Sequence, residues 1–447
     1  MVRRRSFHAV MMVLALFVTG LGAATIAAAD DHTPHAAATL TLEGVLRDVV
    51  DANPTLQARR AMGTAAEKRV APAGAWDSPM AEVGVTNVPT SGRFDTDMMT
   101  MKMVGLSQRI PLFGSNGLRR RAAREGAEAE GAAIDRAHYD IFGAAIDAYA
   151  DAYFSKRRAE EAAHHRGTMD RMAEAATARY RSGNGRLDDV LRAEAERARV
   201  LADQAAFEAA AARASARLDA LRGRDPGTTP ERFAPPPPLA IPAESDSWAS
   251  AAREHHPRLR EAEARARGYD LSARAARRMA WPDLTVRASY GFREATPQGI
   301  DRDDMFSAGV GFVIPIFAGQ RERAIGAGFD AMARAAAAER REAELDLGRE
   351  AHALHAEARA AARTVALLAD TVVTTQRRAM EAAWSAYSAG SIDLWRVFES
   401  AHALYVEDLR LLDAQHDLAR AQARLVALTG RSDLAGVTLP AMRKEER

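Results

Sequence analysis

Cysteine is absent from the 447 residues of the sequence. This excludes disulfide bridges, and it also excludes a lipid-modified cysteine at a mature N-terminus. After the first residues, no stretch approaches 18 uninterrupted apolar residues, so no membrane-spanning helix is predicted. If such a chain enters a membrane, it must do so as a closed β-barrel, because lipid cannot form hydrogen bonds with unpaired backbone N–H and C=O groups.

Aromatic residues are scarce, and helix-breaking residues are missing from long stretches. Aromatics make up 6% of the chain, and no proline occurs between Leu118 and Tyr180. The dominant residues are Ala, Arg and Glu, which are strong helix formers. At about 1.5 Å per residue this stretch predicts a helix of roughly 95 Å, and the stretch from Arg321 to Tyr387 repeats it. Such lengths favour a coiled coil or a helical array.

The first residues have the features of a targeting segment. Three arginines, from Arg3 to Arg5, precede an apolar run, and the alanines from Ala27 to Ala29 offer a small-residue cleavage site. We therefore predict a secretory signal peptide over residues 1–29. Its three arginines would take the formal net charge from +1 to −2, which argues against a nucleic-acid binder.

The chain is a tandem duplication in which four features recur in order at offsets of 203 to 207 residues. Asn53-Pro54 recurs as His256-Pro257, and Trp76 recurs as Trp281. Gln108–Gly114 recurs as Phe312–Gly319, and Tyr180–Gly183 recurs as Tyr387–Gly390. Such a repeat predicts one pseudo-symmetric body made of two equivalent halves. The predicted parts are a first repeat over 40–224, a Pro-rich linker over 225–244, a second repeat over 245–430 and a C-terminal tail over 431–447.

Each half is predicted to contain a helical hairpin with a tight tip. Gly183 and Gly390 stand just past the long helices, where glycine accepts the left-handed backbone that ends a helix. The expected return helices cover 187–221 and 392–428, and the expected opening helices cover 41–71 and 246–279.

Strand-like alternation occurs only between the opening helix and the long helix of each half. Over 284–292, apolar residues alternate with Thr285, Arg287, Ser289 and Gly291, so that one face of a strand is apolar. Similar runs at 81–86, 102–108 and 306–314 give four strands, joined within each half by the polar loops 89–97 and 294–304.

This alternation fits a transmembrane barrel with its apolar side outward. A soluble hairpin packed on the helices is the alternative, but a hairpin between very long helices has little core to rest on. Because four strands cannot close a barrel, the membrane interpretation requires several copies of the chain.

The ordered set of motifs resembles the outer membrane efflux protein family, the TolC-like channels. The matching features are the opening segment from Leu42 to Leu56, the strand exits Ile110–Gly114 and Ile314–Phe317, and the paired Tyr-x-x-Gly tips. They extend from about Leu40 to Gly430. Pro111 and Pro315 match the junctions between barrel and helix, where a residue without an amide donor suits the change of backbone.

The resemblance implies a mostly α fold with a small β part. Long helical hairpins would form a periplasmic α-barrel, and four strands per chain would join a trimeric 12-strand barrel in outer membrane lipid. The implied function is passive exit of drugs or heavy-metal ions delivered by a periplasmic adaptor and an inner membrane pump. No enzyme activity, cofactor or nucleic acid is expected.

The resemblance also implies that the tip closes through polar contacts between the two hairpins. Asp189 matches an aspartate of this contact and Tyr387 its tyrosine partner, but Ile392 replaces the arginine that completes it. At the two positions of an acidic ring stand Glu399 and Arg396, so cation preference is not implied.

The tip acids also have a purely structural explanation. Asp188 and Asp189 fall in the first turn of a helix, where carboxylates favour the helix dipole. The linker residues Pro235 to Pro238 predict a stiff extended strap, which in the family girdles the tunnel together with the C-terminal tail.

Metal-binding patterns are weak in the sequence. Glu161 with His164, and Glu399 with His402, have the Glu-x-x-His spacing of helical di-iron sites, but matching lone glutamates are not evident, and no metal ligand set is predicted. A cluster of thioethers at Met98, Met99, Met101 and Met103 could contact soft metal ions, although flexible packing is the commoner role.

Two other classes of protein remain as alternatives. A soluble periplasmic coiled-coil adaptor or scaffold should show a lipoyl-like β-domain beside a single helical hairpin, whereas this chain has two hairpins. A helical metalloenzyme would need converging ligands that the sequence does not reveal.

Overall fold

The computed structural model describes residues 39–229, 232–237 and 246–430. The predicted signal peptide, the C-terminal tail and part of the Pro-rich linker lie outside these ranges. The first half contains α1 (Leu42–Ala52), α2 (Pro54–Ala73), β1 (Met80–Thr86), β2 (Met101–Ile110), α3 (Ser115–Arg181) and α4 (Leu187–Leu221). The second half contains α5 (Asp246–His255), α6 (Pro257–Arg278), β3 (Asp283–Phe292), β4 (Met305–Val313), α7 (Glu322–Leu367), η1 (Leu368–Val373), α8 (Thr374–Ser388) and α9 (Leu394–Thr429). The prediction of a mostly helical chain with a small β part is confirmed.

Each opening helix is broken in two, whereas the sequence pattern predicts one continuous helix over 41–71 and another over 246–279. The break falls at Asn53 between α1 and α2, and at His256 between α5 and α6. Both residues have extended backbone, because the proline that follows disfavours the helical region for the residue before it. Both then cap the helix that the proline starts.

The four strands form one antiparallel sheet in the order β1-β2-β3-β4. The two halves are joined in it by β2 and β3, with Val104 opposite Tyr290 and Leu106 opposite Ala288. Because the pairs are directly opposite, their side chains share one face. Apart from Lys102 and Gln108 of β2, that face is mostly apolar, and it carries Val83, Val85, Val104, Leu106, Val286, Tyr290, Phe306, Val310 and Phe312, each at least 40% exposed.

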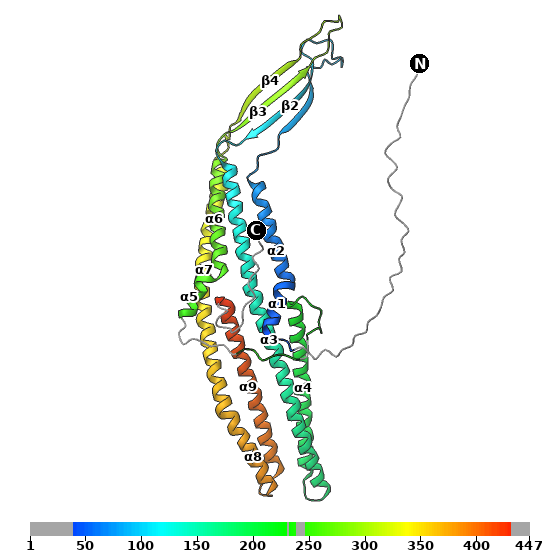
Figure 1. The fold of residues 1–447 in the computed structure, drawn as a ribbon, viewed down its shortest axis with the longest axis vertical. Coiled ribbons are helices and arrows are strands. Elements are labelled where there is room, and N and C mark those ends of the chain that lie inside the picture. Colours follow the sequence, from blue (N-terminus) through cyan, green and yellow to red (C-terminus); the bar gives the residue numbers. More distant parts are fainter. Residues whose placement is uncertain (1–38, 230–231, 238–245, 431–447) are drawn as a thin grey trace, which may run out of the picture. The chain divides into compact units, whose positions relative to one another are not determined.

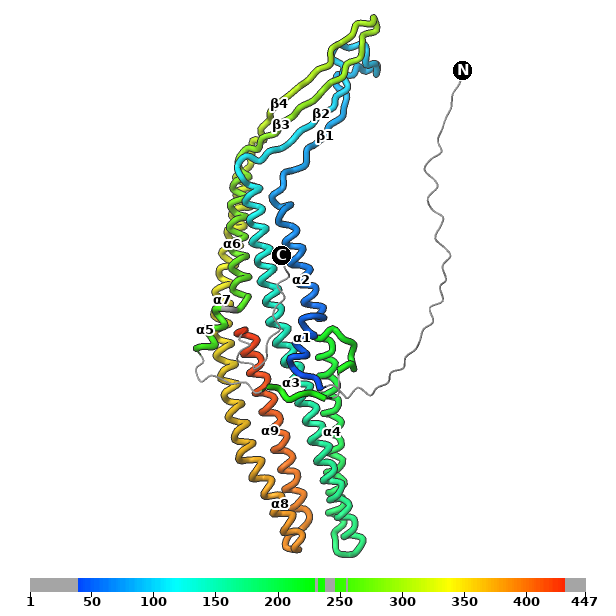
Figure 2. Tube along the Cα trace, viewed as in Figure 1, coloured from blue at the N-terminus to red at the C-terminus, as the bar shows by residue number. Residues whose placement is uncertain are grey.

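The long helices run from the sheet to the tips (Figures 1 and 2). Helix α3 has 67 residues and packs on α4, α6, α9 and α2. Its counterpart spans α7, η1 and α8, and the six residues of η1 form a π-helical segment that the sequence analysis did not foresee. None of the helices in the described ranges combines the length and the apolar character needed to cross a membrane.

The core of the first half lies where α1 meets α3, α4 and α9. Val45, Leu46 and Val49 of α1 are fully buried there, and Tyr149 of α3 packs with them. The Tyr149 hydroxyl donates to the carbonyls of Leu40 and Ala234, at 2.9 and 2.6 Å. The linker therefore returns along the chain start and is anchored to the middle of α3.

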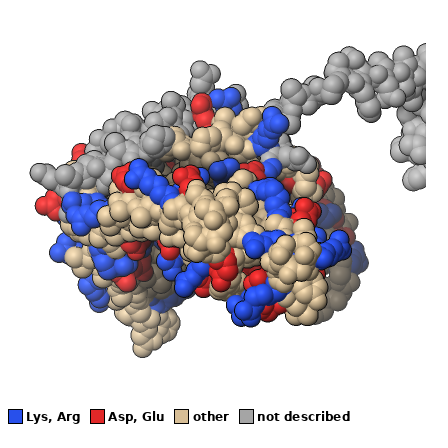
Figure 3. All heavy atoms as spheres, turned by 90° about the horizontal axis from the view of Figure 1, so that it is seen from below, with Lys and Arg blue, Asp and Glu red and all other residues tan. Residues whose placement is uncertain are grey.

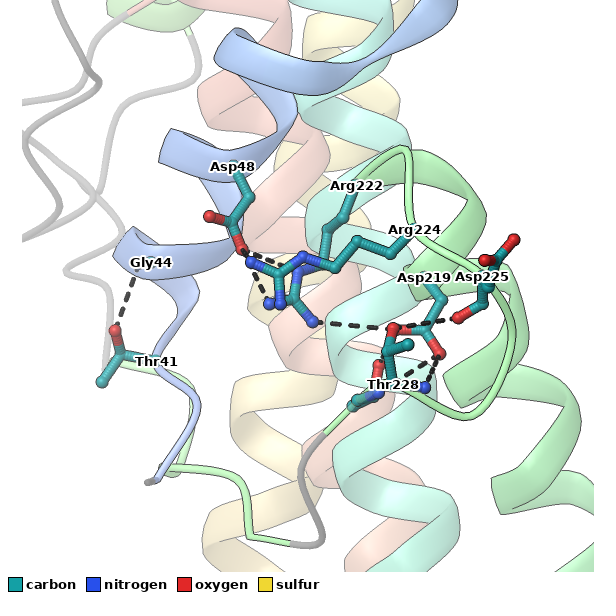
Figure 4. A network of polar contacts seen from close by, with 9 residues as sticks. Thr41, Gly44, Asp48, Asp219, Arg222, Arg224, Asp225 and Thr228 are labelled. Carbon is teal, nitrogen blue, oxygen red and sulfur yellow. Dashed lines mark hydrogen bonds and ion pairs between the residues drawn. The ribbon is translucent and has the colours of Figure 1, made fainter. Parts of the chain in front are cut away.

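A polar network beside this core fixes the C-terminal end of α4 (Figure 4). The Arg222 guanidinium lies 2.7 Å from the Asp48 carboxylate on α1, and it is 3% exposed. Asp219 is fully buried and accepts from the amides of Gly227 and Thr228, at 2.9 and 3.2 Å. The end of the first hairpin is thus held to both α1 and the linker.

Candidate functional site at the helical tips

The two tip turns have the same backbone structure. Gly183 and Gly390 adopt φ of 76° and 74°, the left-handed region that favours glycine. In the first turn the Asn184 amide donates to the Arg179 carbonyl, and in the second the Ser391 amide donates to the Ala386 carbonyl, both at 2.9 Å. This is the six-to-one hydrogen bond of a Schellman motif, so the two halves end their long helices in the same way.

Tyr387 contacts the first hairpin through Arg179. The Arg179 guanidinium lies over the Tyr387 ring, 5.2 Å from its centroid. Interaction with Tyr387, together with the negative charge of Asp189, raises the pKa of Arg179. An arginine thus stands at the contact between hairpins, but it comes from α3, whereas the resemblance implied one at the position of Ile392.

The predicted acids lie close by on α4. Asp188 pairs with Arg186 at 2.8 Å, and the hydrogen bond from Arg186 lowers the pKa of this carboxyl group. Asp189, also half-buried, faces the positive charges of Arg179 and Arg186. The structure therefore gathers both aspartates with the arginines of the tip.

Helix α9 carries the other two predicted residues. Arg396 and Glu399 lie 3.5 Å apart on one helix face, and both are exposed. Directly before Arg396, the Trp395 ring lies under the Arg192 guanidinium of α4, which is 4.8 Å from the ring centroid. The end of the molecule that carries the tips shows basic and acidic side chains interspersed with uncharged ones (Figure 3).

An apolar cluster lies behind these polar contacts. It joins Met169 and Met172 of α3 to Val397 and Phe398 of α9, all at most 3% exposed. Ile392 packs against it. The residue that replaces the expected arginine therefore adds to an apolar contact between the hairpins.

One cluster of metal-ligating side chains was missed by the sequence analysis. His165 of α3, Glu196 of α4 and His402 of α9 present ligand atoms within 4.8 Å of one another. Burial lowers the pKa of His165 to about 4, with smaller effects from His402 and His164, so its ring is neutral near pH 7. Spacing along the chain gives no signal for this site, because the residues come from three helices.

The remaining predicted residues lie near the sheet. Pro111 directly follows β2, and Pro315 comes two residues after β4. Met98 and Met99 are exposed in the loop before β2. In the strand itself, the Met103 sulfur accepts a hydrogen bond from the Thr86 hydroxyl at 2.9 Å, which is a packing role.

Solved structures share this fold. The chain superposes on a membrane protein from Pseudomonas aeruginosa with a TM-score of 0.74 and 18% identity, covering 87% of this chain and 93% of that one. The outer membrane protein VceC of Vibrio cholerae superposes with a TM-score of 0.72 and 18% identity, covering 87% of this chain and 96% of VceC. The open state of the MtrE outer membrane channel of Neisseria gonorrhoeae superposes with a TM-score of 0.68 and 21% identity, covering 87% of this chain and 88% of MtrE.

The sequence itself identifies the family. No curated protein matches it directly. The family model described as outer membrane efflux protein matches residues 45–224 and 248–431, which is most of the chain and both of its halves. The chain therefore belongs to the outer membrane efflux protein family, whose members are outer membrane channels with a periplasmic helical extension and not enzymes.

Proposed function

We propose that this chain is the outer membrane channel of a tripartite efflux system and works as a homotrimer. Three copies would form a 12-strand barrel in outer membrane lipid and a 12-helix tunnel in the periplasm. A periplasmic adaptor and an inner membrane pump would deliver the substrate, a drug or a heavy-metal ion. The channel supplies a passive route, and the pump supplies the energy.

The sheet is the observation that carries this proposal. Its exposed face bears the large apolar side chains of all four strands, whereas the other face bears small and polar residues such as Gly84, Ser289 and Gly309. Lipid would cover the first face and water the second. Among the residues that the structure describes, the outer strands β1 and β4 each pair on one side only, so a neighbouring copy at each edge would complete the ladder.

Control of the channel is proposed to lie at the tips. The closed state would be held by the contact between Arg179 and Tyr387, with Asp188 and Asp189 beside it. Arg396 and Glu399 would line the narrow part of the tunnel, where their opposite charges weaken any preference for cations. Opening would require the two hairpins to separate at these contacts.

The native mass of the protein extracted from outer membranes tests the assembly. The expected result is a trimer that depends on detergent. A monomer or dimer that stays in solution without detergent would contradict the proposal. It would favour the periplasmic coiled-coil adaptor or scaffold instead.

A further inference from the structure

His165, Glu196 and His402 form a site with unused ligand capacity. His165 is 5% exposed, and its Nε2 atom is buried without a hydrogen-bond partner. Glu196 is equally enclosed, with 8% exposure. Buried polar atoms normally have a hydrogen-bond partner, so an unpartnered imidazole nitrogen beside a buried carboxylate is a candidate ligand for an ion.

Neighbouring side chains fix the orientation of these groups. The His165 ring stacks on Tyr405, with centroids 4.2 Å apart and an interplanar angle of 5°. Arg199 binds one oxygen of Glu196, Oε2, at 3.0 Å. The other oxygen, Oε1, lies 2.7 Å from His402 Nδ1. At metal sites, contacts of this kind orient the side chains that bind the ion directly.

We propose that His165, Glu196 and His402 bind a divalent transition-metal ion, of which Zn²⁺ fits the ligand set best. Two imidazoles and one carboxylate form a common set for zinc, with a fourth position left to water. His402 is half exposed, which gives an ion and its water access from solvent.

The ligand atoms of the three side chains must move only slightly closer together to bind an ion. Zn²⁺ ligands at about 2.0–2.2 Å from the ion lie about 3.4 Å apart in a tetrahedron. The separation of up to 4.8 Å must therefore shrink by up to about 1.4 Å. His402 is exposed, so its side chain has room to rotate toward an ion held by the buried pair.

The position of the site gives it a consequence for the two hairpins. Helices α3 and α4 form the first hairpin, and α9 belongs to the second. An ion shared among them would link the hairpins on the sheet side of the tip contacts. If the hairpins separate during opening, which rests on the proposed function, bound Zn²⁺ would favour the closed state.

Zn²⁺ binding to the detergent-extracted, chelator-treated protein tests the site directly. Competition with a chromophoric chelator should reveal one strong site per chain. His402→Gln and Glu196→Gln should each weaken it at least about tenfold. The matched control is His164→Gln, because His164 is exposed and adjacent to His165 but lies outside the cluster.

Cobalt provides a second measurement that reports the ligands themselves. Co²⁺ in the same site should give the visible absorption bands of a tetrahedral ion, and these should vanish in Glu196→Gln and persist in His164→Gln. Equal binding by the wild type and both site variants would overturn the proposal. That result would leave the channel function intact, since the readout is binding and not transport.

Discussion

Asn53 and His256 occupy equivalent places in the two halves, and each caps a helix that begins with proline. Asn53 Oδ1 accepts from the amides of Thr55 and Leu56, at 3.0 and 3.1 Å. His256 Nδ1 accepts from the amide of Arg258 at 3.2 Å. Both caps are buried, but only the histidine can take up a proton in the physiological range.

His256→Asn should therefore make the protein more resistant to acid. Burial, and after it the charges of Arg258 and Arg136, lowers the pKa of His256 from 6.5 to about 4. The unfolded chain then binds more protons than the folded one between these values. The stability that comes from the neutral cap is complete above pH 6.5 and is lost as the pH falls to about 4.

The loss amounts to about 3 kcal/mol per chain in the wild type and should be missing in His256→Asn. Unfolding midpoints at several pH values between 7.5 and 4 measure it. Asn53→Asp adds a titratable cap at the equivalent place and serves as a comparison. Parallel pH profiles for wild type and His256→Asn would contradict the prediction.

Arg179→Ala should favour the open channel. The contact with the Tyr387 ring is worth about 0.5–1 kcal/mol at an exposed site. Its loss should lower the ratio of closed to open states about two- to fivefold per protomer. Open probability in planar bilayers measures this ratio.

Arg181→Ala is the matched control for Arg179→Ala. Arg181 is exposed in the same last turn of α3, so the variant removes the same charge from the tip. An equal effect of the two variants would assign the change to net charge instead of the Tyr387 contact.

Val310→Arg should block membrane assembly. Val310 is 63% exposed near the middle of β4 on the apolar face of the sheet. An arginine facing lipid at mid-membrane costs about 2–4 kcal/mol. The yield of folded trimer on seminative gels should fall. Ser307→Arg, on the opposite face of the same strand, should assemble normally, and failure of both variants would argue against the proposed lipid-facing side.

Asp219→Asn should loosen the linker from α4. Burial raises the pKa of Asp219, but hydrogen bonds from the Thr229 and Thr228 side chains and from backbone amides outweigh it, so the net pKa is lowered. Its contribution to stability is present above the unfolded pKa and is lost as the pH falls through the folded one.

Hydrogen bonds to a charged group contribute about 1.5–3 kcal/mol, so Asp219→Asn should lower the unfolding midpoint at neutral pH and speed proteolysis of the linker. Asp225→Asn is the control, because Asp225 accepts from Thr228 through its backbone carbonyl. Equal proteolysis rates in wild type and Asp219→Asn would refute the role of this carboxylate.

Local patterns predicted most of the fold. Glycine at 183 and 390 and the alternation over 284–292 located the tips and the strands, because both depend on a few adjacent residues. The breaks at Asn53 and His256 had a signal in the prolines that follow. The π-helical segment over Leu368–Val373 had no signal of this kind.

The tip contacts were harder to predict because they join residues far apart in the chain. The position of Tyr387 in its turn follows from its motif, but its contact with Arg179 depends on how two hairpins pack. The same holds for the cluster of His165, Glu196 and His402. Glu-x-x-His spacing drew attention to His402 with Glu399, whereas the fold places it beside Glu196.

The polar network around Arg222 anchors the first hairpin at the end away from its tip. Arg222 and Asp219 fix one end of α4 to α1 and the linker, while the other end is free of the sheet and reaches the tip. Helix α4 has 35 residues, so it is about 50 Å long. Because α3 packs along α4, a tilt of about 5° of the whole hairpin about this end would move the tip, and Arg179 with it, by about 4 Å, a displacement comparable to the 5.2 Å between the Arg179 guanidinium and the Tyr387 ring.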